Sequence, residues 1–429
     1  MSPAREPIGV IGTGYVGLVT AAGFAELGSE VWCVDIDAEK IERLRRGEVP
    51  IFEPGLAELL ARNIERLHFS TEPKDALEQA RLLFIAVGTP PTHSGDADLT
   101  AVNDVVDQLP GSDRHALVMK STVPCGTGAT IQRIFRDRGK GGMAYVSCPE
   151  FLKEGSALKD FMDPDRVVVG DNGDWAGDAV VELYSPLKAP LVRTDVASAE
   201  MIKLAANAFL ATKISFINEI ANVCEETGAD VIEVARGVGL DDRIGPKFLQ
   251  AGIGYGGSCF SKDVSALKLL AANSGYHFQL LNAVTEVNEL QKRRVVSKLQ
   301  RHLGGLAGKR IGLLGLAFKP ETDDMRGASS LVLAARLLAE GAVVSAYDPI
   351  AEDEARKLMP QLAYRDSAFG AVQDADAIVL VTEWEELREL DWPEVSGRMR
   401  GDLLVDGRNA LDPETVRAAG LHYEGIGRR

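Results

Sequence analysis

The chain has few of the residues that mark secreted, membrane-spanning or metal-binding proteins. Its 429 residues include six histidines and five scattered cysteines. An odd number of cysteines without a CxxC pair favours reduced thiols over disulfides or a zinc site. No histidine has a metal-ligand spacing, so we expect no metal. No apolar run approaches the ~18 residues that cross a bilayer. The short polar start predicts no signal peptide, and we therefore expect a cytoplasmic protein.

Positive charge is also scarce. The chain has 47 Lys and Arg against 63 Asp and Glu, a net charge of −16. This balance argues against a nucleic acid or an anionic membrane as a partner. It does not exclude an anionic small ligand, because a few local cations can form such a site. The length predicts two or three domains.

The first 35 residues carry a dinucleotide-binding pattern. An apolar run at 8–11 leads into Gly12-Thr13-Gly14-Tyr15-Val16-Gly17, a helical pattern follows, and the strand at 30–34 closes on Asp35. Strand, GxGxxG, helix, strand and acid form the complete fingerprint, whereas a tight turn without a cofactor is the plainer alternative. The helix N-terminus provides N–H groups and a dipole for the phosphates. Asp35 would accept hydrogen bonds from ribose hydroxyls and repel a 2′-phosphate, which favours NAD over NADP.

The rest of the chain alternates between strand and helix patterns. Such alternation predicts a parallel, doubly wound sheet. A long helix is predicted over 196–227, apolar on most sides and therefore buried by another domain or subunit. From Lys309 a weaker βαβ pattern recurs without GxGxxG and closes on Asp348. We expect an α/β protein with two Rossmann-like doubly wound domains joined by a long central helical connector. Further strands of the first domain are predicted at 82–87, 116–120, 143–147 and 166–170. We expect the chain to divide into three regions, at 1–195, 196–303 and 304–429.

The segment 254–263 combines glycines with one cysteine. It reads Gly-Tyr-Gly-Gly-Ser-Cys-Phe-Ser-Lys-Asp. A thiol near Lys262 and Asp263 has neighbours that can activate it or shuttle protons. The alternative is a buried structural Cys259 in a glycine-rich turn. A dehydrogenase with a nucleophilic cysteine can take an alcohol past the aldehyde to the acid. On the long helix, Lys203 and Asn207 are four residues apart and share a face. On so apolar a helix both side chains need partners, and an inter-domain salt bridge and a hydrogen bond are the structural alternative to a functional role.

Eight separated motifs give the chain a family resemblance. It resembles the UDP-glucose/GDP-mannose dehydrogenase family over essentially its whole length, and most of all the branch that acts on UDP-glucose. One departure is Cys148, where the family usually has asparagine before Pro-Glu-Phe. The motifs are Gly12–Gly17, Phe52-Glu53-Pro54-Gly55-Leu56, Gly88-Thr89-Pro90, Ser121-Thr122-Val123-Pro124-Cys125-Gly126-Thr127, Pro149-Glu150-Phe151-Leu152-Lys153-Glu154-Gly155, Glu200-Met201-Ile202-Lys203 with Asn207, Gly256-Gly257-Ser258-Cys259 with Lys262-Asp263, and Phe318-Lys319.

The resemblance implies an NAD-dependent, two-step oxidation of the sugar C6 alcohol to a carboxylate. Asp263, Lys203 and an ordered water are the candidates for the base of the first step, with Thr122 and Asn207 positioning groups. Lys203 and Asn207 would then bind the oxyanion that forms when Cys259 attacks the aldehyde. Glu150 and Asp263 would steer the water that hydrolyses the thioester.

The resemblance also implies the binding residues. Lys40 would lie near the adenosine ribose, Glu154 on the nicotinamide side, and Arg243 would reach across a subunit interface of a homo-oligomer that is at least a dimer. The last region would bind the UDP-sugar. The implied cofactor residues are Gly12, Thr13, Gly14, Tyr15, Val16, Gly17, Asp35, Lys40, Gly88, Thr89, Thr122, Glu154, Lys262 and Arg326. The implied substrate residues are Phe151, Leu152, Lys153, Lys203, Asn207, Arg243, Phe248, Gly256, Lys319 and Arg408.

Two other functions remain open at this point. The first is a related dehydrogenase that acts on GDP-mannose or a UDP-N-acetylhexosamine. The approach Arg243-Ile244-Gly245-Pro246-Lys247-Phe248 and the cysteine segment favour UDP-glucose instead. The second is a non-catalytic nucleotide-sugar sensor, which has no need of Cys259, Lys203 and Asp263 together.

Overall fold

The computed structural model describes residues 5–139 and 142–428, which form two compact units. The first unit contains the residues up to Ala206 together with Ser265–Tyr276, and the second contains Asn207–Val264 and the residues from His277 on. The boundary falls inside two helices, α9 (Val196–Thr227) and α11 (Ser258–Asn273). The bounds of α9 are those that the sequence predicted.

The first unit is built on an eight-stranded sheet with the order β3-β2-β1-β4-β5-β6-β7-β8. Side chains of successive residues enter different cores: Leu82 and Phe84 of β4 pack into one apolar cluster, whereas Leu83 and Ile85 pack into another. Both faces are therefore covered, which is the doubly wound arrangement. The strands are β1 (Ile8–Ile11), β2 (Val31–Val34), β3 (Leu67–Ser70), β4 (Leu82–Ile85), β5 (Ala116–Met119), β6 (Ala144–Ser147), β7 (Val167–Gly170) and β8 (Leu191–Thr194).

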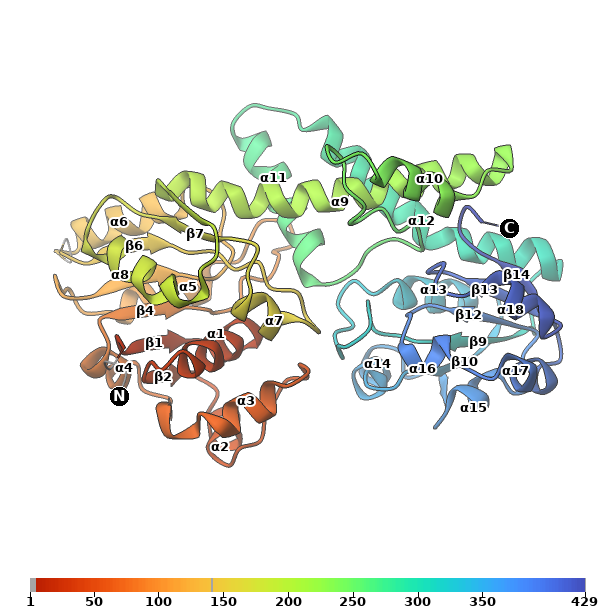
Figure 1. Ribbon diagram of the computed structural model, residues 1–429, viewed down its shortest axis with the longest axis horizontal. Helices are drawn as coiled ribbons and strands as arrows, with labels where there is room; N and C mark the ends of the chain where they lie inside the picture. The colour runs from red at the N-terminus through yellow and green to blue at the C-terminus, as the bar shows by residue number, and fades with distance from the viewer. Residues whose placement is uncertain (1–4, 140–141, 429) are drawn as a thin grey trace. The chain divides into compact units, whose positions relative to one another are not determined.

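The sheet is not parallel throughout, which corrects the expectation from the sequence. β7 pairs with β6 in the antiparallel sense, at Ser147 and Gly170. A parallel pair needs a crossover that returns the chain to the starting edge of the sheet. The segment between these strands instead packs its helix α7 (Ala157–Met162) against α1 (Tyr15–Glu26) (Figure 1). The rings of Phe24 and Phe161 lie 5.2 Å apart. β7 therefore starts from the opposite edge, and β8 follows it in parallel.

The other helices of the first unit connect successive strands or flank them. Val102 and Val106 of α5 and Ile131 and Phe135 of α6 lie in one of the two cores. These helices are α2 (Ala38–Arg45), α3 (Leu56–Arg62), α4 (Pro73–Gln79), α5 (Thr100–Gln108), α6 (Thr127–Asp137) and α8 (Trp175–Tyr184).

The second unit contains a six-stranded sheet with the order β11-β10-β9-β12-β13-β14, parallel throughout. This sheet confirms the second Rossmann-like fold. Its strands are β9 (Arg310–Leu314), β10 (Val343–Tyr347), β11 (Ala363–Tyr364), β12 (Ala377–Leu380), β13 (Leu403–Asp406) and β14 (His422–Glu424). Its helices include α10 (Val231–Gly239), α12 (Gln279–Leu303), α13 (Ser329–Ala339), α14 (Glu352–Leu358), α15 (Ala368–Val372), α16 (Glu385–Arg388), α17 (Trp392–Arg398) and α18 (Pro413–Ala418).

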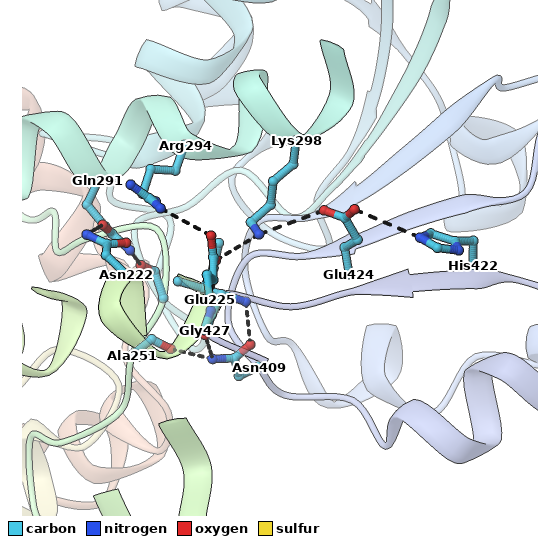
Figure 2. A network of polar contacts seen from close by, with 12 residues as sticks. Asn222, Glu225, Ala251, Gln291, Arg294, Lys298, Asn409, His422, Glu424 and Gly427 are labelled. Carbon is cyan, nitrogen blue, oxygen red and sulfur yellow. Dashed lines mark hydrogen bonds and ion pairs between the residues drawn. The ribbon is translucent and has the colours of Figure 1, made fainter. Parts of the chain in front are cut away.

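A polar network fastens the end of the chain to the helices of the second unit (Figure 2). Glu225 of α9 accepts hydrogen bonds from the backbone N–H of Gly427 at 2.9 Å and from Arg294 at 3.1 Å. Lys298 of α12 is buried and lies 2.7 Å from the same carboxylate. The network therefore ties α9, α12 and the residues after β14 together.

The part of α9 in the second unit is only partly covered. Phe209, Phe216 and Val223 are 65%, 53% and 57% exposed and follow one another at intervals of seven residues. Side chains seven apart lie on one face of a helix. On the other side, Ile217 and Ala221 are fully buried. Within the described residues, no helix is both long enough and apolar enough to cross a membrane.

Candidate active site

The turn after β1 has the backbone that a dinucleotide needs. Gly12 has φ +97°, and a Cβ there would lie 2.7 Å from the carbonyl oxygen of Ala86. A Cβ on Gly17 would lie 1.8 Å from the carbonyl oxygen of Gly12. At Gly14 the space around the Cβ position is open, and this residue caps α1 without a side-chain hydrogen bond. The first and third glycines thus close the turn, and the second leaves the helix N-terminus accessible to phosphates.

Asp35, at the end of β2, presents a fixed negative charge beside this turn. Its Oδ2 accepts hydrogen bonds from the backbone N–H and the hydroxyl of Thr13, both at 2.8 Å, and from Lys40 at 3.0 Å. Its Oδ1 accepts from the backbone N–H of Asp37. Burial would raise the pKa of Asp35, but these hydrogen bonds outweigh it and hold the pKa below its usual value. The open glycine turn and this carboxylate fit NAD, and the charge disfavours a 2′-phosphate.

Two loops at the carboxyl ends of β4 and β5 meet beside each other. The hydroxyl of Thr89 donates a hydrogen bond to the carbonyl oxygen of Thr122 at 2.9 Å. Ser121 donates to the carbonyl oxygen of Val87 at 2.7 Å. Ligands of doubly wound sheets bind at this edge. The structure therefore brings together two residues that the sequence predicted separately, Thr89 and Thr122.

The loop after β6 places a carboxylate against the lysine of α9. The Nζ of Lys203 donates to Oε1 of Glu150 at 2.8 Å, and the two side chains are 4% and 6% exposed. Burial would raise the pKa of Glu150, but the charge and hydrogen bond of Lys203 lower it overall. Glu150 is therefore an anion at neutral pH, and its other oxygen accepts from the backbone N–H of Leu152.

Two cations that the sequence analysis missed lie around this loop. The guanidinium of Arg166 stacks 3.5 Å from the ring centroid of Phe151. The Nζ of Lys120 lies 2.8 Å from the hydroxyl of Tyr184 and 3.9 Å from the sulfur of Cys148. Lys120 thus lies beside Cys148, the position at which the family usually has asparagine. Neither contact has a local sequence signal, because each partner is distant along the chain.

Cys259 lies on a helix, and not in a glycine-rich turn as one alternative had it. The turn ends at Gly257, and α11 begins at Ser258, so the exposed thiol belongs to the first helical turn. A Cβ on Gly256 would meet the carbonyl oxygen of Gly327 at 2.5 Å. The glycines therefore let this loop pack against the loop after β9. A helix N-terminus favours an anion at this position.

Asp263 follows Cys259 by one helical turn and is almost fully buried. Its Oδ2 accepts a hydrogen bond from the amide of Asn207 at 2.6 Å. The Nζ of Lys262 lies 2.8 Å from its Oδ1. Residues four apart share a helix face, so the thiol and this carboxylate lie on one side of α11.

The remaining predicted cations each have a partner. Arg408 donates to the carbonyl oxygens of Val381, Gly254 and Phe318 at 2.7, 3.1 and 2.9 Å, so it fixes the loop before α11 from β13. Phe248 has φ +65°, a strained conformation that is frequent at functional sites. The other predicted cations are paired as follows: Lys153 with Asp160 (2.9 Å), Arg243 with Asp241, Arg326 with Asp324 (2.8 Å) and Lys319 over the Phe318 ring (5.4 Å).

Three family models cover most of the chain. Residues 6–188 match the NAD binding domain of the UDP-glucose/GDP-mannose dehydrogenase family, residues 197–290 its central domain, and residues 312–413 its UDP binding domain. The cofactor is accordingly NAD, which is what the carboxylate of Asp35 led us to expect.

Individual relatives agree with these models along the whole chain. The UDP-glucose 6-dehydrogenase TuaD of Bacillus subtilis is 48% identical over 99% of this chain and 93% of its own length. A UDP-glucose 6-dehydrogenase of Pseudomonas aeruginosa is 47% identical over 98% of this chain and 97% of its own. The structure of a UDP-glucose dehydrogenase from Pyrobaculum islandicum has a TM-score of 0.93 at 38% identity and covers 100% of this chain and 99% of that one. The chain therefore belongs to the UDP-glucose/GDP-mannose dehydrogenase family.

Proposed function

We propose that the protein oxidises UDP-glucose to UDP-glucuronate with NAD, in two steps that pass through a covalent intermediate on Cys259. The observation that carries this proposal is the exposed Cys259 on the first turn of α11, with Asp263 one turn later held by Asn207 and Lys262. A nucleophile needs access, and a buried carboxylate with fixed partners can take or orient a proton.

UDP-glucose is the substrate that the relatives support best. Relatives at 41% to 48% identity are named UDP-glucose 6-dehydrogenases. A UDP-D-ManNAc dehydrogenase of Pyrococcus horikoshii shares the fold at a TM-score of 0.85 but only 27% identity. We therefore rank the other nucleotide sugars below UDP-glucose.

The chain's own residues account for proton and charge transfer. When bound, NAD supplies the hydride acceptor for both oxidations, alcohol to aldehyde and thiohemiacetal to thioester. Asp263 or an ordered water takes the proton of the C6 hydroxyl, because Lys203 is already charged in its ion pair with Glu150, while Thr122 positions groups near it. Cys259 then forms a bond from sulfur to C6 as the aldehyde oxygen becomes an oxyanion. Lys203 and Asn207 donate hydrogen bonds to that oxygen.

Hydrolysis releases the product. Glu150 is held in its anionic form by Lys203, so it can accept a proton from the attacking water. Asp263 assists it in steering that water. The water oxygen bonds to C6, the bond from sulfur to carbon breaks, and the thiolate of Cys259 is restored.

The remaining predicted residues keep the roles that the resemblance implied. Lys40 and Glu154 serve the two ends of NAD, and residues 304–429 bind the UDP-sugar. We further propose a cytoplasmic homo-oligomer, at least a dimer. The exposed apolar face of Phe209, Phe216 and Val223 on α9 supports the assembly, because such a face costs free energy in water.

Replacement of Cys259 tests the proposal. Cys259→Ala should form no UDP-glucuronate, because the thioester route is lost. Cys259→Ser should be nearly inactive and accumulate an ester, since an alkoxide leaves less readily than a thiolate. The matched control is Cys125→Ala, another thiol that is not fully buried and lies on the loop before α6. Acid formation by Cys259→Ala at the rate of the control would contradict the mechanism.

A further inference from the structure

Glu53, which has no role in the proposed reaction, joins two parts of the first unit. It belongs to the Phe52-Glu53-Pro54-Gly55-Leu56 motif and is 6% exposed. Its Oε2 accepts hydrogen bonds from the hydroxyl of Tyr15 and from the backbone N–H of Gly155, the latter at 2.7 Å. Its Oε1 accepts from the backbone N–H of Ala157 at 2.7 Å. Tyr15 opens α1 directly after Gly14, whereas Gly155 and Ala157 end the loop that carries Glu150.

The loop of residues 150–157 contains a backbone turn, in which the N–H of Ser156 donates to the carbonyl oxygen of Lys153 at 3.0 Å, and the N–H groups of four other residues donate to carboxylates. The N–H of Leu152 donates to Glu150 at 2.6 Å and that of Lys153 to Asp160 at 2.9 Å. The N–H groups of Gly155 and Ala157 donate to Glu53. Glu53 differs from the other two carboxylates because it also binds Tyr15 of the glycine-rich turn. The local order of a loop that is held by side chains depends on whether those side chains are themselves fixed.

Tyr15, Glu53 and Gly155 form a closed set of contacts, which we name the clasp. The N–H of Gly155 approaches the Tyr15 hydroxyl at 3.2 Å as well as Glu53. Burial, with Glu53 as the next cause, raises the pKa of Tyr15 well above its usual value, so its hydroxyl remains a donor at neutral pH. Glu53 receives three donors in a buried place, where an unsatisfied donor is costly.

We propose that Glu53 is a positioning residue that couples occupation of the NAD turn to the order of the loop 150–157. Tyr15 is the first residue of α1, the helix whose N-terminus would hold the pyrophosphate of NAD. Fixing that helix end fixes the Tyr15 hydroxyl, which through Glu53 fixes Gly155 and the loop that carries Glu150. Energetic coupling of this kind is reciprocal, so an ordered loop also favours NAD. The inference deepens the proposed function. Its test does not depend on the sugar, so the two can fail separately.

Hydrogen exchange of the loop amides with and without NADH tests the coupling. In the unaltered protein, saturating NADH should slow exchange at residues 152–157 by about tenfold, the size of an ordinary coupling between sites. Tyr15→Phe keeps Glu53 and both of its bonds to the loop, and should reduce the response to below about twofold. Glu53→Gln should do the same. The control is Tyr145→Phe, which removes a hydroxyl 3.4 Å from the buried carboxylate of Glu200 in the same unit and should keep the full response.

Binding of NADH is measured by its fluorescence, and the NADH concentration is adjusted so that each variant has the same fractional occupancy before hydrogen exchange is compared. A full response in Tyr15→Phe at matched occupancy would overturn the proposal, as would the absence of a response in the unaltered protein. Complete loss of NADH binding by Tyr15→Phe would also overturn it, because the coupling through Glu53 predicts an affinity that is weakened about tenfold and not abolished. If Glu53→Gln does not fold, Tyr15→Phe decides alone.

Discussion

The two Rossmann-like units share the order of six parallel strands but differ at the turn after the first strand. In the first unit α1 begins at Tyr15, three residues after Gly12. In the second, Gly315 repeats the left-handed glycine with φ +84°, but α13 begins only at Ser329. The helix N-terminus that would hold a pyrophosphate is therefore absent from the second turn, although the strand order around it is the same.

The aspartate that follows the second strand of each sheet also differs between the two units, since that of the first unit is the more exposed. Asp35 keeps 9% of its surface exposed and accepts a hydrogen bond from the side chain of Lys40, which is 28% exposed. Asp348 is 2% exposed, and its Oδ2 accepts from Trp384 and from the backbone N–H groups of Leu316 and Ala317. A carboxylate closed in this way serves the protein's own loops. The comparison teaches that a Rossmann topology alone does not specify a dinucleotide site.

Replacing a glycine in each turn should produce the largest contrast. In Gly17→Ala the new Cβ would lie 1.8 Å from a backbone oxygen, so the turn must shift. We expect the NADH dissociation constant to rise on the order of 10²-fold, as for a displacement of about 1 Å in a preorganised site. In Gly315→Ala the Cβ would lie 2.5 Å from that of Thr382, which should destabilise the second unit by about 1–3 kcal/mol and leave NADH binding unchanged.

NADH titrations and denaturant unfolding of the two variants separate these outcomes. Equal losses of NADH affinity in Gly17→Ala and Gly315→Ala would break the comparison between the turns.

Replacing Asp348 and Asp35 should give smaller effects, on stability for the first and on cofactor preference for the second. Asp348→Asn leaves buried donors of the second unit without an acceptor, which should lower the free energy of unfolding by about 3 kcal/mol. Its preference for NAD over NADP should not change. Asp35→Asn should narrow that preference on the order of tenfold, because the charge facing the 2′ position is lost. Values of kcat/KM for both cofactors provide the measurement, and an Asp348→Asn variant with altered cofactor preference would contradict it.

The pH dependence of Asp35 should show the smallest effect. Its pKa lies below the usual value in the folded protein, so its contribution to stability is present above the pKa of the unfolded chain, about 3.9, and is lost as the pH falls through the folded pKa. The difference in unfolding free energy between the unaltered protein and Asp35→Asn should be full at pH 7 and shrink below about pH 4. Denaturant unfolding across this range checks it, and a difference that grows on acidification contradicts it.

Local patterns predicted much of this architecture, and long-range contacts account for what was missed. The spacing Gly12 to Asp35 and the apolar run of α9 are local, so both were predicted. The antiparallel entry of β7 depends on how α7 packs against α1, which no strand pattern records. The strands β3, β8, β11 and β14 were also missed, and β8 is the clearest case, because it is short and its residues are mostly exposed.

The candidate site shows the same division. Cys259, Asp263, Lys203 and Asn207 were chosen from short motifs. Their partners were visible only in three dimensions, since Glu150 is 53 residues from Lys203 and Asp263 is 56 from Asn207. The placement of Cys259 on a helix was missed because four nearby glycines indicate a turn more strongly than the following residues indicate a helix.

The stoichiometry of the unaltered enzyme tests the central claim most directly. A limiting amount of UDP-glucose is incubated with excess NAD, and the NADH formed is counted by absorbance while the sugar product is identified by mass. Oxidation of an alcohol to an acid removes two hydrides, so the account predicts two NADH for each UDP-glucose and UDP-glucuronate as the product. One NADH for each sugar with release of the aldehyde, or no NADH at all, would contradict it.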